Sequence, residues 1–248
     1  MSCHRCRGCS TISAERAQGL ELDKECDIVV AVTGQPNVGK STLFNRITGR
    51  TVRVGNFPGT TVEMSVGRKR YRRYTICFID LPGVYGLSAS SIDEKIARDY
   101  IVGGYADVYL VLVDATIPQR SFYLALQVLE LTPNVVIALT KWDKARKLGI
   151  HIDTERLSAK LGVPVVPVSG LTGEGIRELL EALVRVAVEG RGVRESLLGI
   201  DYGVLEKYID LVEQKLKAVE VLKKYPSRWV AVRLLEEDEE ILRVLEEA

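Results

Sequence analysis

Short runs of β-branched and aliphatic residues alternate along the chain with segments of helical periodicity, and this alternation constrains the fold more than any other feature. The runs lie at 27–33, 74–80, 108–114, 134–140 and 163–168, and one more strand is expected ahead of a basic turn at 68–73. The helical segments lie at about 40–48, 90–102, 119–131, 153–161 and 174–188. Strands that alternate with helices predict an α/β fold, here a mostly parallel six-stranded sheet flanked by helices.

Three segments are expected from the change of pattern along the chain. Residues 1–25 lack apolar periodicity and are predicted to form a flexible leader, 26–190 form the α/β domain, and 191–248 form a small all-helical domain. With 46% apolar residues and a net charge of +1, the chain can bury a large core and has no general attraction for nucleic acid or anionic membranes. Its longest aliphatic runs are far below the ~20 residues that span a bilayer, so no transmembrane segment is expected.

A glycine-rich loop follows the first predicted strand directly and precedes a helix. Its sequence is Gly34-Gln-Pro-Asn-Val-Gly-Lys-Ser41. This is the pattern and the position of a P-loop, in which backbone N–H groups and the positive end of the helix surround a β-phosphate. We expect Lys40 to reach the β- and γ-phosphates and the Ser41 hydroxyl to bind Mg²⁺. The other residues expected to contact a nucleotide here are Gly34, Asn37, Val38, Gly39 and Thr42.

A second motif, Asp80-Leu-Pro-Gly83, ends the third predicted strand. Its carboxylate is placed to hold the hydrated Mg²⁺, and the Gly83 N–H is placed to meet a γ-phosphate. In isolation Asp-x-x-Gly indicates an ordinary turn. In this order after a P-loop, it indicates nucleotide chemistry.

The base is predicted from Thr140-Lys-Trp-Asp143, after the fifth predicted strand. The Asp143 carboxylate can accept hydrogen bonds from N1–H and the exocyclic amine of guanine, a pair that adenine does not offer. The aliphatic stem of Lys141 is expected to cover the purine face. A loop after the last predicted strand is expected to contact guanine O6, and its first residues are Ser169, Gly170 and Leu171. Together the motifs predict a P-loop GTPase fold that binds GTP and GDP.

Three further stretches make the likeness more specific: 54–63, 84–100 and 226–235 closely resemble the ferrous iron transport protein FeoB family. The resemblance covers about residues 27–240. It implies a slow GTPase domain and a helical domain that favours the GDP-bound state. It also implies attachment to a membrane-embedded transport region that is absent from this chain, on the cytoplasmic face of the cell membrane. Nucleotide state would then gate Fe²⁺ uptake, and small accessory Feo proteins are candidate partners.

The same resemblance implies two metal contacts. By position Thr61 resembles the switch threonine whose hydroxyl joins Mg²⁺ when the γ-phosphate is bound. Val84 stands where many small GTPases have a glutamine that orients water, so another group must do this. Asn37 resembles the asparagine by which related GTPases bind K⁺ between the phosphates, unless it only stabilises its loop. Thr140 replaces the usual asparagine, which predicts weaker nucleotide affinity with guanine selectivity retained by Asp143.

Two other functions share these motifs. A ribosome- or RNA-associated GTPase would need a basic RNA module, but the segment from Arg194 to Ala248 has thirteen acidic and nine basic residues, so no nucleic-acid partner is expected. A GTP-binding module that does not hydrolyse GTP is the other alternative, which Val84 would permit.

The remaining candidate functional residues are three cysteines near the N-terminus and a basic cluster at 68–73. Cys3, Cys6 and Cys9 have metal-ligand spacing but lack a fourth cysteine for an iron–sulfur site, so metal binding and a thiol-containing leader both stay open. No disulfide framework is expected from five cysteines. The basic cluster at 68–73 is interpreted as a solvated hairpin turn in preference to a lipid or RNA contact.

Overall fold

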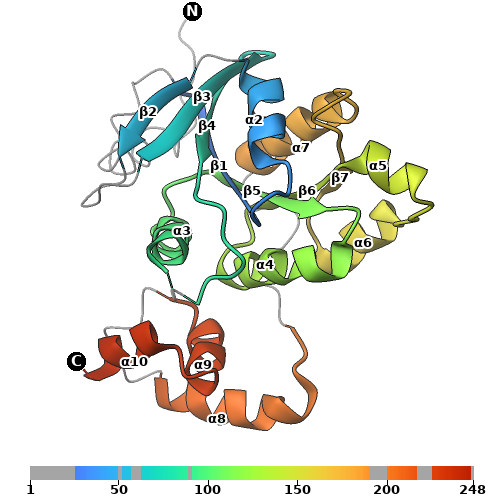
Figure 1. Ribbon diagram of the computed structural model, residues 1–248. Helices are drawn as coiled ribbons and strands as arrows, with labels where there is room; N and C mark the ends of the chain where they lie inside the picture. Colours follow the sequence, from blue (N-terminus) through green and yellow to red (C-terminus); the bar gives the residue numbers. More distant parts are fainter. Residues whose placement is uncertain are drawn as a thin grey trace, which may run out of the picture.

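A single mixed sheet forms the centre of the α/β part of the chain, with strand order β2-β3-β4-β1-β5-β6-β7 (Figure 1). The computed structural model describes residues 26–49, 52–56, 63–88, 91–189, 200–216 and 225–246. Neighbouring strands from β4 to β7 in this order run parallel, whereas β2 and β3 run antiparallel at one edge. The strands are β1 (Ile28–Gly34), β2 (Val52–Asn56), β3 (Glu63–Tyr71), β4 (Tyr74–Asp80), β5 (Val108–Asp114), β6 (Val135–Thr140) and β7 (Val165–Pro167).

This sheet confirms the predicted P-loop GTPase fold and adds β2 to the six expected strands. The strand β2 escaped prediction because it is five residues long and lies at the sheet edge, paired only with β3. The basic cluster is also longer than a turn. Arg68 lies within β3, and the turn itself is made by Arg72 and Arg73.

Helices cover both faces of the sheet, as parallel strands require. Alternate residues of one strand point to opposite faces, so Val30 packs in a core with α2 (Lys40–Thr48) and α7 (Ile176–Glu189), whereas Ala31 packs in the opposite core. That opposite core is covered by α3 (Ile92–Val102), α4 (Pro118–Leu131), α5 (Trp142–Lys147) and α6 (Thr154–Leu161). Because the strands are parallel, the loops after β1, β4, β6 and β7 all emerge at one edge of the sheet.

A small helical unit follows, as predicted. It contains the 3₁₀ turn η1 (Gly203–Leu205) and the helices α8 (Glu206–Leu216), α9 (Ser227–Leu235) and α10 (Glu239–Glu246). These helices pack around Trp229, whose side chain is 1% exposed. The predicted domain boundary at 190/191 and the predicted leader at 1–25 fall outside the described residues.

The helical unit packs against α3 and α4 (Figure 1). Arg98 of α3 and Asp238, which precedes α10, form an ion pair at 3.6 Å, and both side chains are fully buried. Beside them Lys95 pairs with Glu240 at 2.7 Å. On α4, Glu130 accepts a hydrogen bond of 2.9 Å from the Tyr202 hydroxyl. Charged contacts therefore fix the helical unit to the two helices that follow β4 and β5.

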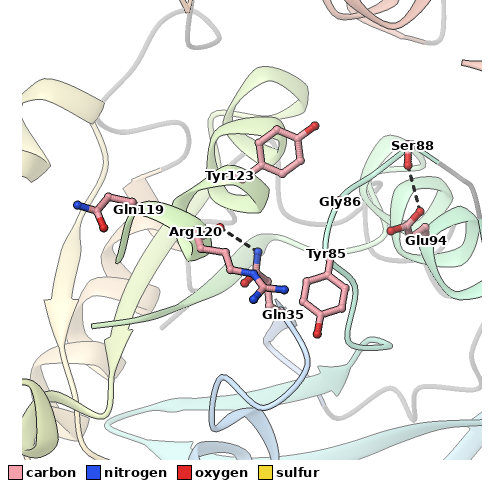
Figure 2. Close-up of a pocket in the computed structure, with 8 residues that line it drawn as sticks. All are labelled: Gln35, Tyr85, Gly86, Ser88, Glu94, Gln119, Arg120 and Tyr123. Atoms are coloured by element: carbon pink, nitrogen blue, oxygen red, sulfur yellow. Dashed lines mark hydrogen bonds between the residues drawn. The ribbon is translucent and has the colours of Figure 1, made fainter. Parts of the chain in front are cut away.

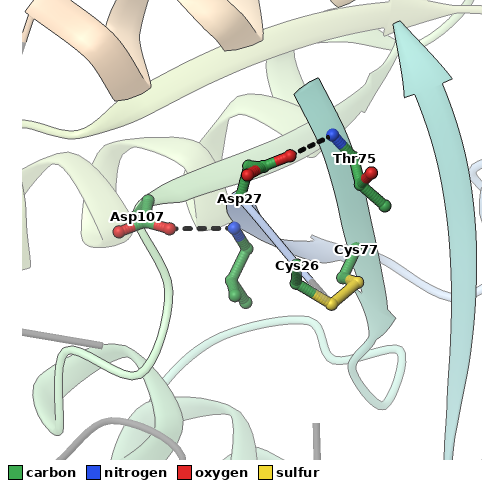
Figure 3. Close-up of a disulfide and its surroundings, with 6 residues drawn as sticks. Cys26, Asp27, Thr75, Cys77 and Asp107 are labelled. Carbon is green, nitrogen blue, oxygen red and sulfur yellow. Dashed lines mark hydrogen bonds between the residues drawn. A yellow bond between two sulfur atoms is a disulfide. The ribbon is translucent and has the colours of Figure 1, made fainter. Parts of the chain in front are cut away.

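A disulfide joins Cys26 to Cys77, which corrects the expectation that no disulfide forms (Figure 3). Cys77 lies in β4, adjacent to β1, and Cys26 lies two residues before the start of β1. Hydrogen bonds between Asp27 and Thr75 hold this end of the two strands together. The sequence gives no sign of the pairing because it depends on the register of strands whose cysteines are 51 residues apart.

Candidate functional site

The loop between β1 and α2 has the backbone shape of a phosphate cradle. Asn37 and Gly39 both have left-handed backbones, with φ of 64° and 96°, and Gly39 is the N-cap of α2. Left-handed residues in such a loop turn successive N–H groups toward one concave side, where an anion binds. A glycine is needed at Gly34, since a Cβ there would lie 2.9 Å from Cγ1 of Val38. The geometry of the predicted P-loop is therefore present.

Lys40 and Asp80 meet at the mouth of this loop. The Lys40 ammonium donates to Oδ1 of Asp80 over 2.5 Å, and both side chains are about 15% exposed. Burial raises the pKa of the Asp80 carboxyl above its ordinary value, and the Lys40 charge offsets part of that rise. The two residues that were expected to serve phosphate and Mg²⁺ thus lie side by side. Ser41 and Thr42 are exposed in the first turn of α2.

The Asp-x-x-Gly segment lies directly on the phosphate loop. The Val84 N–H donates to the Gly34 carbonyl over 3.2 Å. A Cβ on Gly83 would make an ordinary van der Waals contact with the Pro36 backbone at 3.5 Å, so Gly83 lies directly beside the loop. The side chain of Val84 is 2% exposed and apolar, so it offers no group to a water molecule.

The base-reading segment is tied to the same loop. The Thr140 hydroxyl donates to the Val38 carbonyl over 2.6 Å. Thr140 therefore braces the phosphate loop from the base-reading segment. Asp143 follows in the first turn of α5 and is half-buried. It reaches this position because Lys141 adopts a left-handed backbone, φ 54°, as the N-cap of α5.

The loop after β7 completes this edge of the site. The Ser169 hydroxyl accepts a hydrogen bond of 3.1 Å from the Thr172 N–H, which shapes the turn. Gly170 packs on the first turn of α2, where a Cβ would meet Leu43 N at 3.1 Å. The Leu171 carbonyl accepts from Arg46 of α2 over 3.1 Å, and its side chain is 76% exposed. The residues predicted for guanine O6 are thus held against the helix of the phosphate loop.

Asp114 is a site residue that the sequence analysis missed. It ends β5, and one carboxylate oxygen pairs with the Lys141 ammonium at 2.5 Å. Its other oxygen accepts from the Thr116 N–H and hydroxyl. Burial alone would raise the pKa of Asp114, but the hydrogen bonds from Lys141 and Thr116 outweigh it and lower the pKa. In the sequence, the only sign of Asp114 is its position at the end of a buried strand, at the sheet edge where the nucleotide-binding motifs lie.

The structure therefore brings most predicted site residues to one edge of the sheet: the P-loop residues, Asp80, Gly83, Thr140, Lys141, Asp143 and the loop from Ser169. Thr61, Cys3, Cys6 and Cys9 lie outside the described residues. The side chain of Asn37 is exposed and has no hydrogen-bonding partner among the residues that the structure describes. In that same part of the chain, no three His, Cys, Asp or Glu side chains group as a metal site.

The strand order and these loops define the class of the protein, a P-loop GTPase domain followed by a small helical domain. Comparison with known families gives the particular family. The profile of the ferrous iron transport protein B family matches residues 28–183, and that of the FeoB cytosolic helical domain matches residues 202–248. The chain therefore belongs to the FeoB family.

Relatives and solved structures agree. The Fe(2+) transporter FeoB of Methanocaldococcus jannaschii is 43% identical over 216 residues, which cover 87% of this chain and 32% of that protein. A Porphyromonas gingivalis fusion of Fe(2+) transport protein A and FeoB is 38% identical over 242 residues, which cover 95% of this chain and 29% of that protein. The chain thus spans about a third of the length of these relatives.

Among solved structures, the cytosolic domain of T. maritima FeoB in a GDP form is 42% identical, with a TM-score of 0.81 over 88% of this chain and 85% of that one. Its GMPPNP form is similar with a TM-score of 0.77, over 88% and 86% of the two chains. Every helix in the described residues is too short or too polar to cross a membrane.

Proposed function

We propose that this chain binds GTP and GDP, hydrolyses GTP slowly, and through its nucleotide state gates the uptake of Fe²⁺ by a membrane-embedded transport region. The observation that carries the proposal is the 2.6 Å hydrogen bond from Thr140 to the Val38 carbonyl. It joins the segment that holds Asp143 to the phosphate loop, which suits one ligand with both a guanine and a polyphosphate. The GDP and GMPPNP forms of the T. maritima relative support the same ligands here.

Phosphate binding follows from the cradle and its charges. Lys40 would exchange its contact with Asp80 for the β- and γ-phosphates, where it supplies positive charge. The backbone N–H groups from Asn37 to Ser41 and the N-terminus of α2 would hold the β-phosphate. No group moves far in this scheme, because the ammonium already lies at the mouth of the loop.

The donor atoms at this edge fit Mg²⁺. Ser41 and Asp80 offer a hydroxyl and a carboxylate, the hard oxygen donors that Mg²⁺ takes while phosphate and water complete its shell. Thr61 would add a second hydroxyl when the γ-phosphate is bound. When bound, the ion would neutralise charge that develops on the phosphates.

Hydrolysis requires a group other than residue 84 to organise the attacking water. Gly83 would offer its N–H to the γ-phosphate, while the buried Val84 side chain stays out of the reaction. Asn37 has an exposed amide at the cradle, and we infer that its oxygen holds K⁺ beside the phosphates. K⁺ would supply there the positive charge that an arginine supplies in other GTPases.

Gating would run through α3, which begins five residues after Leu87. The ion pair of Arg98 with Asp238 links this helix to the helical unit, so a shift of α3 with nucleotide state would reach α10. We propose that these contacts favour the GDP-bound state. The transport region would be the partner on the membrane side, on the cytoplasmic face of the cell membrane. The P. gingivalis fusion supports a small accessory Feo protein as another partner.

GTP turnover in matched K⁺ and Na⁺ buffers tests the proposal. The unchanged chain should hydrolyse GTP at least about tenfold faster in K⁺, and Asn37→Ala should remove that difference while GDP still binds. Asp143→Ala should lose GTP binding, and ATP should bind far more weakly than GTP to the unchanged chain. Equal rates in the two salts would exclude the K⁺ role. Equal affinity for ATP would exclude the guanine site.

Single-turnover hydrolysis also separates the alternatives. A module that signals by occupancy alone would bind GTP without cleaving it in either salt. An RNA-associated GTPase would need a basic surface on its second domain, which the acidic segment after Arg194 does not supply.

A further inference from the structure

Residues 84–88, which follow Gly83, run along one face of α4 (Figure 2). The Leu87 N–H donates to Oε1 of Gln127 over 2.9 Å, and the Gln127 side chain is buried. The guanidinium of Arg120 lies 5.2 Å from the centre of the Tyr85 ring. Two side chains of α4 therefore hold two residues of this short segment.

These two contacts come from a single helix face. Residues 120, 123 and 127 are three and seven positions apart, a spacing that places them in one row along a helix. Between the two contacts Gly86 fits closely, since a Cβ there would meet Gln127 Oε1 at 3.2 Å and the Tyr123 ring at 3.4 Å. Tyr85, Gly86 and Leu87 therefore each contact a side chain of α4.

A hollow of about 420 Å³ lies beside this face. Its lining is Gln35, Tyr85, Gly86, Ser88, Glu94, Gln119, Arg120 and Tyr123. The rings of Tyr85 and Tyr123 are about half exposed there, so neither is locked by surrounding core. The buried Val84 is already held by its hydrogen bond to Gly34, so the Arg120 contact adds restraint at the next residue, the half-exposed Tyr85.

The phosphate loop is attached to the same turn of α4. The Gln35 amide donates to the backbone carbonyl of Arg120 over 3.0 Å. The backbone of Arg120 therefore holds the phosphate loop, and its side chain holds Tyr85. Truncating the side chain removes the second contact and leaves the first in place.

We propose that Arg120 is a positioning residue for GTP hydrolysis, which keeps residues 84–87 in register with the phosphate loop so that the Gly83 N–H stays aligned with a γ-phosphate. The inference rests on the proposed GTPase function. Arg120 acts through Tyr85 and does not itself touch the nucleotide. Gln127 fixes the far end of the same segment.

Single-turnover GTP hydrolysis and GDP affinity, measured on the whole chain, test this role. Arg120→Ala should slow hydrolysis roughly two- to fivefold, the range that a lost cation–π contact at an exposed site gives, with GDP affinity unchanged. Arg120→Lys should restore most of the rate, since lysine keeps a cation over the ring. Tyr85→Phe should match the unchanged chain, and Tyr85→Ala should match Arg120→Ala. Gln119→Ala is the control, because Gln119 lines the same hollow and its side chain makes no hydrogen bond within the described residues.

Amide hydrogen exchange in the GDP-bound protein gives a readout that does not need catalysis. Residues 84–88 should exchange faster in Arg120→Ala than in Gln119→Ala. If the unchanged chain hydrolyses no GTP, the proposed function fails, and the exchange result still decides the role of Arg120. Unchanged exchange, or a lysine variant no better than alanine, would overturn the inference.

Discussion

Arg98 of α3 and Asp238 ahead of α10 form an ion pair at 3.6 Å in which neither side chain is exposed to solvent. The Asp238 carboxylate also accepts from the N–H groups of Glu240 and Ile241, both over 3.2 Å, and so caps α10. One carboxylate therefore both starts the last helix and neutralises a cation of the GTPase domain. Such a pair costs much to break, because the remaining charge stays buried.

Asp238→Ala should lower the free energy of unfolding by about 3 kcal/mol, since it removes the cap of α10 and leaves the buried Arg98 charge only the longer contacts, 3.9 Å each, to Asp99 and Glu240. Urea unfolding followed by circular dichroism measures this change. Asp210→Ala, on the exposed face of α8, is the matched control and should stay within about 0.5 kcal/mol. The double variant Arg98→Met/Asp238→Leu should recover most of the loss. An Asp238→Ala protein as stable as the control would contradict a structural role for the pair.

Asp80 should make the nucleotide-free protein less stable as the pH rises. Its pKa is raised by burial above the ordinary 3.8, with Lys40 offsetting part of the rise. Between 3.8 and that raised pKa the folded state binds more protons than the unfolded state, so unfolding free energy falls with increasing pH across this window. At pH values above the raised pKa, the charged Asp80 carboxylate lowers the free energy of unfolding relative to a neutral side chain.

Asp80→Asn should therefore be at least as stable as the unchanged chain at pH 7, and the difference should shrink as the pH falls toward 3.8, where Asp80 is itself neutral. Thermal unfolding from pH 7 to pH 4 without nucleotide measures it. The same variant should lose Mg²⁺-dependent GTP binding. Asp80 would then lower the stability of the nucleotide-free protein and be required for its activity. A large loss of stability at pH 7 would show that the contact with Lys40 dominates over burial.

Thr140→Val should weaken GDP binding by roughly five- to thirtyfold. Valine has the shape of threonine but cannot donate to the Val38 carbonyl, and a lost hydrogen bond with a stranded buried acceptor costs ~1–2 kcal/mol. Competition with a fluorescent GDP analogue measures the affinity. Thr140→Ser keeps the hydroxyl and serves as the control. Should valine and serine bind GDP equally well, the brace to the phosphate loop would have no role in affinity.

The parts of the site that the sequence predicts are the ones encoded by neighbouring residues. The P-loop, Asp80 with Gly83, and Asp143 each follow a strand that the hydrophobic pattern predicts, so parallel strand order alone brings them to one edge. The helices from α2 to α4 and from α6 to α10 follow from periodicity in the same way. The helix α5 was missed because its six residues are too few to show a period.

The parts that escaped prediction depend on contacts between distant residues. Asp114 pairs with a lysine 27 positions away, and Cys26 with a cysteine 51 positions away. Each pairing needs the register of two strands or loops, which no local pattern encodes. Thr140 is another residue whose contact with a distant part of the chain could not be predicted. The weaker nucleotide affinity expected from its identity stays a prediction, and the hydrogen bond of its hydroxyl to the Val38 carbonyl was not foreseen because the two residues are far apart in the sequence.

The disulfide between Cys26 and Cys77 should stabilise the fold by about 4 kcal/mol, because it closes a loop across 51 residues and so restricts the unfolded chain. The segment closed by the disulfide, residues 26–77, includes the phosphate loop and β3. The disulfide fixes its two ends beside the paired strands β1 and β4. Cys26→Ser should lower the urea midpoint of the oxidised protein, and Cys26 is the better site because it is only half-buried. The unchanged chain with reductant is the matched control and should unfold at the same midpoint as the variant. A midpoint that reductant does not move would show that the crosslink contributes nothing to stability.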